Sequence, residues 1–120
     1  MTLASNAKAS LATSRWVASA SGQVRRQLRG GGRVDEVTVP SPPPASLRST
    51  RALRVTLRVA TRNCLRRSLL RQAWFAAEGD QRDLVIGVRR SPEFGAHAWL
   101  EGDVVPPEEA FEELLRLPSR

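Results

Sequence analysis

The sequence Pro-Ser-Pro-Pro-Pro at residues 40–44 divides the chain into two parts. Proline lacks a backbone N–H and fixes its φ angle, so this stretch can continue neither a helix nor an interior strand. Residues 33–39 before it carry three valines that alternate imperfectly with polar groups. We therefore expect residues 1–44 to form an N-terminal segment with a linker, and residues 45–120 to form the main domain.

The first 30 residues predict one basic helix. Apolar side chains recur there at partly helical spacing, and three glycines at 30–32 end the pattern. These apolar residues are Trp16, Val17, Val24 and Leu28. The absence of acidic residues before Asp35 is also typical of an organellar transit peptide, although an ordinary basic helix accounts for the composition equally well.

Residues 46–62 fit two patterns. Four apolar residues between 53 and 59 alternate with Arg and Thr at the period of a strand, whereas Leu53, Leu57 and Ala60 form a helical stripe. A segment of about 15 residues without Gly or Pro is longer than a usual strand, so we expect a helix.

A second helix is expected to begin at Cys64. Asn63 is a favourable N-cap and Gly79 suits the position just beyond the C-terminus. One face of this helix comprises Leu65, Ser68, Leu69, Gln72, Ala73 and Ala76, and Leu70, Trp74 and Ala77 widen the side that is expected to be buried. Cys64 then lies in the first turn, where free N–H groups and the helix dipole stabilise a thiolate, with Arg62, Arg66 and Arg67 nearby. A cysteine becomes a nucleophile in such surroundings.

Two short strands are expected to follow. Residues 83–89 form an apolar run of strand length, and residues 96–101 alternate so that His97 shares a face with Trp99 and Glu101. The residues between these strands include a proline and a glycine that suit a hairpin. The final segment, residues 110–118, fits a closing strand or a short helix.

The net charge of +7 is unevenly distributed. Residues 37–77 hold eight arginines and no acidic residue, whereas residues 78–120 hold ten acidic and five basic residues. The basic part could attract the acidic part, bind an acidic peptide or partner protein, or form a solvated helix surface. Aromatic residues make up 5% of the chain and include no tyrosine, so we expect no nucleic-acid partner of the base-stacking kind.

The content of cysteine and histidine excludes several classes of protein. A single Cys excludes an internal disulfide, and with a single His the chain lacks the usual ligands of a structural zinc site. We expect no metal and no other cofactor. No apolar run approaches the roughly 20 residues that span a bilayer, and the N-terminus lacks a secretory signal core. A free thiol suits a reducing compartment, so we expect a cytoplasmic protein without a transmembrane segment.

The cysteine and the histidine allow two interpretations. A cysteine peptidase or acyl transferase needs a thiolate, an imidazole that moves its proton, an orienting group and oxyanion donors. Cys64 and His97 supply the first two in the order, thiol before imidazole, of papain-like enzymes. In the other interpretation, Cys64 is a small core residue and His97 is a satisfied surface group.

Three short motifs follow one another in this part of the chain. They are Cys-Leu-x-x-Ser-Leu at 64–69, with a glycine at 79, then Leu-Val-Ile-Gly-Val at 84–88, and Ala-His-Ala-Trp-x-Glu at 96–101. In this order and spacing they resemble the central motif of the transglutaminase-like leader peptidases of lasso-peptide biosynthesis, the family that includes the microcin-processing protein. The resemblance covers about a third of the chain.

The resemblance implies a papain- or transglutaminase-like α+β fold, in which the Cys-bearing helix packs on a small antiparallel sheet after a basic helical N-terminal segment. The implied activity removes the leader from a ribosomally made precursor peptide. A leader-recognition protein would deliver the precursor, and an ATP-dependent cyclase would act next. Cys64 would attack the scissile carbonyl, His97 would carry the proton, and N–H groups at the helix start would hold the oxyanion. Acyl transfer to another amine would use the same residues.

The third catalytic residue departs from the family pattern, which places an aspartate after the histidine. A tight turn at residues 102–103 would place Glu108 opposite His97, so Glu108 is the first candidate and Glu109 the second. Asp103 lies at the turn, about 20 Å along the strand from His97, and reaches it only if the chain bends back.

Overall fold

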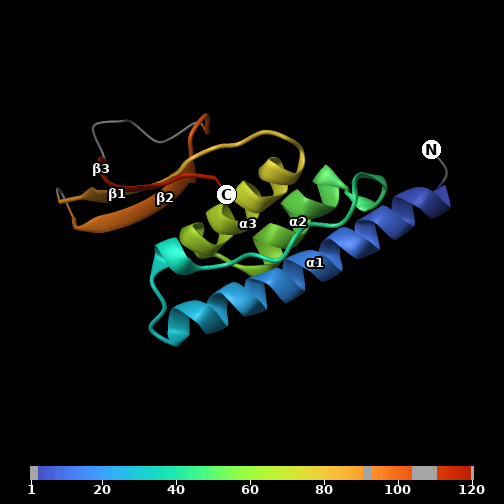
Figure 1. The fold of residues 1–120 in the computed structure, drawn as a ribbon, viewed down its shortest axis with the longest axis horizontal. Coiled ribbons are helices and arrows are strands. Elements are labelled where there is room, and N and C mark those ends of the chain that lie inside the picture. The colour runs from blue at the N-terminus through green and yellow to red at the C-terminus, as the bar shows by residue number, and fades with distance from the viewer. Residues whose placement is uncertain (1–2, 91–92, 104–110, 120) are drawn as a thin grey trace. The chain divides into compact units, whose positions relative to one another are not determined.

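The computed structural model describes residues 3–90, 93–103 and 111–119, and the chain forms two compact units, Met1–Arg62 and Asn63–Arg120 (Figure 1). The helices and the three-stranded antiparallel sheet confirm the expected α+β class. The composition-based boundary at residue 44 differs from this division into units and stays a prediction.

The first unit is built on two helices, α1 (Leu3–Arg29) and α2 (Thr50–Ala60), which pack against each other. The stripe of α1 that is buried recurs at helical spacing and comprises Ala9, Thr13, Trp16, Val17, Ala20, Ser21 and Val24. From α2, Leu53 and Leu57 are buried. Both helices were predicted, and the helical reading of residues 46–62 over the strand reading is confirmed.

The proline-rich linker runs back along α1 and is fixed to it by side chains. The Trp16 indole donates to the Pro40 carbonyl at 3.0 Å, and the Gln27 amide exchanges hydrogen bonds with the backbone of Thr38. Two short 3-10 turns, Val34–Glu36 and Ala45–Leu47, lie before and after the prolines. The linker is therefore part of the first unit's structure.

The second unit begins with α3 (Cys64–Ala77), whose ends are set by the predicted residues. The Asn63 side chain caps the helix by accepting from the Arg66 N–H at 3.0 Å. Gly79 adopts φ +81°, the left-handed conformation that commonly follows a helix C-terminus. Cys64 is thus the first residue of the helix.

The sheet contains β1 (Leu84–Arg89), β2 (Gly95–Leu100) and β3 (Glu112–Leu117) in the order β2-β1-β3. Strands β1 and β2 form the predicted antiparallel hairpin, with His97 opposite Gly87. The final segment, which the sequence left open between helix and strand, is β3. It pairs with β1 across an irregularity between Ile86 and Gly87, so β2 keeps one edge free of strand partners among the described residues.

The buried side of the sheet faces α3, which contacts β2 and β1. Trp74 and Leu70 of α3 are 1% and 0% exposed, and Leu84 and Leu100 of the sheet are 0% exposed. The Gln72 amide adds a polar link by donating to the carbonyls of Arg82 and Leu117. The second unit therefore holds the Cys-bearing helix in a fixed position on the sheet.

Candidate active site

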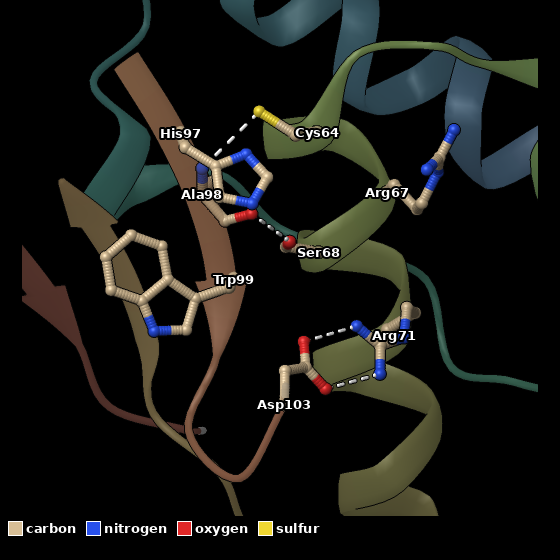
Figure 2. Close-up of a pocket in the computed structure, with 8 residues that line it drawn as sticks. All are labelled: Cys64, Arg67, Ser68, Arg71, His97, Ala98, Trp99 and Asp103. Carbon is tan, nitrogen blue, oxygen red and sulfur yellow. Dashed lines mark hydrogen bonds and ion pairs between the residues drawn. The ribbon is translucent and has the colours of Figure 1, made fainter. Parts of the chain in front are cut away.

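One face of α3 contributes four residues to a pocket of about 270 Å³ (Figure 2). Cys64, Arg67, Ser68 and Arg71 follow the i, i+3, i+4, i+7 spacing that brings side chains to the same side of a helix. The opposite wall comes from β2 and the turn after it, through His97, Ala98, Trp99 and Asp103. The pocket thus collects the thiol, the imidazole and an acid.

The thiol occupies the N-terminus of α3. The N–H groups of Arg66 and Arg67 are bonded to the side chain and the carbonyl of Asn63. The N–H groups of Cys64 and Leu65 come earlier in the helix, where no intrahelical acceptor exists for them. Together with the positive end of the helix dipole, they form a site that favours negative charge beside the half-buried sulfur.

The backbone of Ala98 joins β2 to α3. Its N–H donates to the Cys64 Sγ at 3.4 Å, and its carbonyl accepts from the buried Ser68 hydroxyl at 3.2 Å (Figure 2). Both backbone groups of Ala98 point away from β1. The Glu101 N–H donates to the Asp83 carbonyl, toward β1. Because the direction of the backbone groups alternates from residue to residue along a strand, those of Ala98, three positions earlier, point to the opposite edge. A cysteine and a serine one turn apart therefore satisfy an edge that a strand would otherwise pair.

His97 stands in an aromatic cluster. Its ring stacks on Trp99 at a centroid distance of 5.8 Å and lies 5.4 Å from the ring of Phe111. Trp99 in turn covers Gly87, where an added Cβ would lie 2.7 Å from the indole. A glycine at that position leaves room for the indole on which the imidazole rests.

Arg71 and Asp103 form a bidentate ion pair at the end of β2, with N–O distances of 2.7 and 2.8 Å (Figure 2). The carboxylate also accepts from the Leu100 N–H at 3.0 Å. The Arg71 guanidinium and, to a lesser degree, this backbone bond hold the pKa of Asp103 below its usual range, while partial burial opposes them. Asp103 is therefore a carboxylate, and the pocket contains charges of both signs.

The chain turns back at Asp103, which is the condition under which Asp103 was expected to come near His97. Gly102 has φ +95° and the Asp103 N–H donates to the Leu100 carbonyl at 3.0 Å, so the turn closes immediately after β2. Asp103 consequently lines the same pocket as His97. Glu108 and Glu109, the first and second candidates for the acid, lie outside the described residues.

Sequence reasoning identified Cys64 and His97, and the structure brings both to one pocket. It also named Arg67 as a nearby positive charge, and Arg67 lines the pocket. It did not predict that Ser68 and Arg71 line the same pocket, although their spacing from Cys64 along a helix was a usable signal. The ion pair of Arg71 could not be read from the sequence, because its partner depends on the turn after β2.

No group of three or more potential metal-ligating side chains occurs among the described residues. In the same part of the chain, no helix combines the length and the apolar character needed to cross a membrane.

A comparison with protein-family models matches residues 5–116 to the transglutaminase-like superfamily. The match extends over both compact units and nearly the entire chain. Searches of curated proteins and of solved structures found no match.

Proposed function

The chain belongs to the transglutaminase-like superfamily, and from that premise we propose that it is a cysteine peptidase that removes the leader from a ribosomally made lasso-peptide precursor. The observation that carries the proposal is the position of Cys64 at the start of α3 in a pocket shared with His97. The three sequence motifs between residues 64 and 101 support the narrower choice of substrate.

In the proposed reaction, His97 takes the thiol proton and the Cys64 sulfur attacks the carbonyl carbon of the scissile peptide bond. The N–H groups of Cys64 and Leu65 donate to the oxygen that becomes negative in the tetrahedral intermediate. The intermediate collapses to a thioester when the C–N bond breaks and His97 returns the proton to the departing amine. Water, deprotonated by His97, then cleaves the thioester and releases the leader as a carboxylic acid.

The orienting acid for His97 is proposed in the order given by the sequence, with Glu108 first, Glu109 second and Asp103 third. Arg71 holds both oxygens of Asp103. A carboxylate has further acceptor positions, so this pairing leaves Asp103 as a third candidate. Replacement of each acid by its amide tests the order, because loss of the orienting acid lowers kcat while the substrate KM stays close to that of the parent.

The proposed partners are a leader-recognition protein that delivers the precursor and an ATP-dependent cyclase that uses the new amine. The proposed location is the cytoplasm. Each stands on the resemblance of the motifs. The role of the leader-recognition protein is tested by measuring cleavage of the precursor with and without that protein.

The activity is tested by incubating the protein with lasso-peptide precursors and leader-recognition proteins and following cleavage by mass spectrometry. Cys64→Ala should abolish cleavage and His97→Ala should lower kcat by roughly 10²- to 10⁴-fold, with circular dichroism unchanged. Added hydroxylamine tests for the thioester intermediate, because it converts the acyl-enzyme to a hydroxamate whether water or an amine is the usual acceptor. Cleavage that persists in Cys64→Ala would contradict the proposal.

A second candidate function is a non-catalytic module that holds an acidic precursor or partner protein. It is favoured by the exposed face of α2, where Arg51, Arg54 and Arg58 accompany Val55 and Val59, which are 56% and 84% exposed. Binding of an acidic peptide that survives Cys64→Ala and weakens on neutralising the three arginines would support this function. A matched control is Arg25→Gln, an exposed arginine of α1.

A further inference from the structure

We propose that Ser68 is a positioning residue for the Cys64–His97 pair. It holds the free edge of β2 at a fixed distance from α3, so that the imidazole of His97 can take the proton of the Cys64 thiol. The inference rests on the proposed function for its catalytic meaning. The contacts on which it is built belong to the second unit alone.

The edge of β2 beside α3 has no neighbouring strand among the described residues. A strand edge without a neighbouring strand carries unpaired N–H and carbonyl groups, and burial of such groups without partners is unfavourable. Ala98, which is 5% exposed, has its N–H bonded to the Cys64 sulfur and its carbonyl bonded to Ser68. Both partners come from one helix face, so a single residue of β2 is held at two points.

The two bonds are not equivalent. Sulfur is a weak acceptor, and the contact from the Ala98 N–H to Cys64 is 3.4 Å long. The hydroxyl of Ser68 is a normal donor at 3.2 Å, and its side chain is 3% exposed. A buried serine in the interior of a helix commonly turns its hydroxyl to its own helix backbone, yet here it reaches across to the strand. Ser68 is therefore the stronger of the two attachments.

The attachment acts directly on the catalytic geometry. The Ala98 N–H belongs to the peptide bond that links it to His97, so any movement of Ala98 relative to α3 also moves the imidazole relative to Cys64. Displacement of reacting groups by about 1 Å lowers rates by about 10²-fold. Ser68 thus influences the reaction through the position of β2, without contact with the reacting atoms.

The test compares Ser68→Ala with Ser68→Thr, which keeps a hydroxyl, and with Gln72→Ala as a matched control. Gln72 also links α3 to the sheet, through the carbonyls of Arg82 and Leu117, but does not line the pocket. One readout is hydrogen exchange of the Ala98 amide, measured by NMR relative to the amides of β1. The other is the pH dependence of alkylation by iodoacetamide, which reports on Cys64 alone because it is the only cysteine.

Ser68→Ala should speed Ala98 exchange by about tenfold or more relative to β1, whereas Gln72→Ala should change both by the same factor. Ser68→Ala should also lower the rate of Cys64 alkylation near neutral pH, toward the rate of the double variant Ser68→Ala/His97→Ala. Removing His97 from Ser68→Ala should then have little further effect on that rate. Ser68→Thr should restore both properties in part. This combination supports the inference, since a merely structural serine would affect stability alone.

Unchanged relative exchange of Ala98 in Ser68→Ala overturns the inference, even if the protein proves to be a peptidase. Full retention of the His97 effect on alkylation in Ser68→Ala overturns it equally. By contrast, a parent protein whose alkylation is indifferent to His97→Ala contradicts the proposed function. In that case the exchange of Ala98 still decides whether Ser68 holds β2.

Discussion

The ion pair between Arg71 and Asp103 allows a quantitative test of how the pocket is held together. Asp103→Ala removes two charge-assisted hydrogen bonds from Arg71 and one bond from the N–H of Leu100. The paired side chains are 27% and 18% exposed. The loss should therefore lie between the 0.2–1 kcal/mol of an exposed pair and the roughly 3–5 kcal/mol of a fully buried one. We expect a decrease in the free energy of unfolding of about 2 kcal/mol at pH 7.

The pH dependence of this loss follows from the lowered pKa of Asp103. A carboxyl group with a lower pKa in the folded protein than in the unfolded chain contributes stability that is fully present above the unfolded value of about 4. That contribution is lost progressively as the pH falls through the folded value. The difference between the parent and Asp103→Ala should therefore be constant from pH 6 to 8 and should shrink below about pH 4.

Urea unfolding of the parent and the variant at several pH values measures both quantities. Asp80→Ala is the matched control, because the Arg82–Asp80 pair has an acid that is 48% exposed and should cost less than about 1 kcal/mol. A double-mutant cycle with Arg71→Ala isolates the pair from the bond to Leu100. Equal losses for Asp103→Ala at pH 7 and pH 3, or a loss no larger than that of Asp80→Ala, would refute the reasoning.

Three further substitutions test other parts of the second unit by thermal and urea unfolding. Gly87→Ala should cost about 1–3 kcal/mol and alter tryptophan fluorescence, because the new Cβ would lie 2.7 Å from the Trp99 indole and 3.2 Å from the Glu112 carbonyl; an unchanged midpoint would contradict the packing. Asn63→Ala should cost about 1 kcal/mol through loss of the helix cap, and Asn63→Asp should retain most of that stability. Trp74→Ala should cost about 3–5 kcal/mol, since the side chain is 1% exposed, and a loss below 1 kcal/mol would place it outside the core.

The local elements were predictable because the sequence carries local signals for them. Asn63 and Gly79 mark the two ends of α3, the apolar run in residues 83–89 marks β1, and the alternation in residues 96–101 marks β2. These signals depend on backbone preferences within a few residues. They place Cys64 at the helix start. For that reason the sequence predicts Cys64 as a nucleophile before any tertiary contact is known.

The non-local contacts were not predictable in the same way. The final strand pairs with β1 across the sheet, and nothing in the sequence of β3 states which neighbour it selects. Likewise, a turn at residues 102–103 was expected, but the sequence did not show that this turn brings Asp103 into the pocket with His97. Composition and periodicity do not encode such choices, since they depend on which surfaces meet once the elements have formed.

The hydrogen bonds between α3 and Ala98 involve only main-chain atoms of Ala98, so they restrict which residues can replace it very little. Every residue carries the carbonyl that accepts from Ser68, and every residue except proline carries the N–H that donates to Cys64. Substitutions at position 98 are therefore limited by the size and the polarity that the buried site admits, and not by these two hydrogen bonds. We expect relatives with this arrangement to vary at position 98 among small residues without matching changes at 64 or 68. Proline is the one small residue that the arrangement excludes.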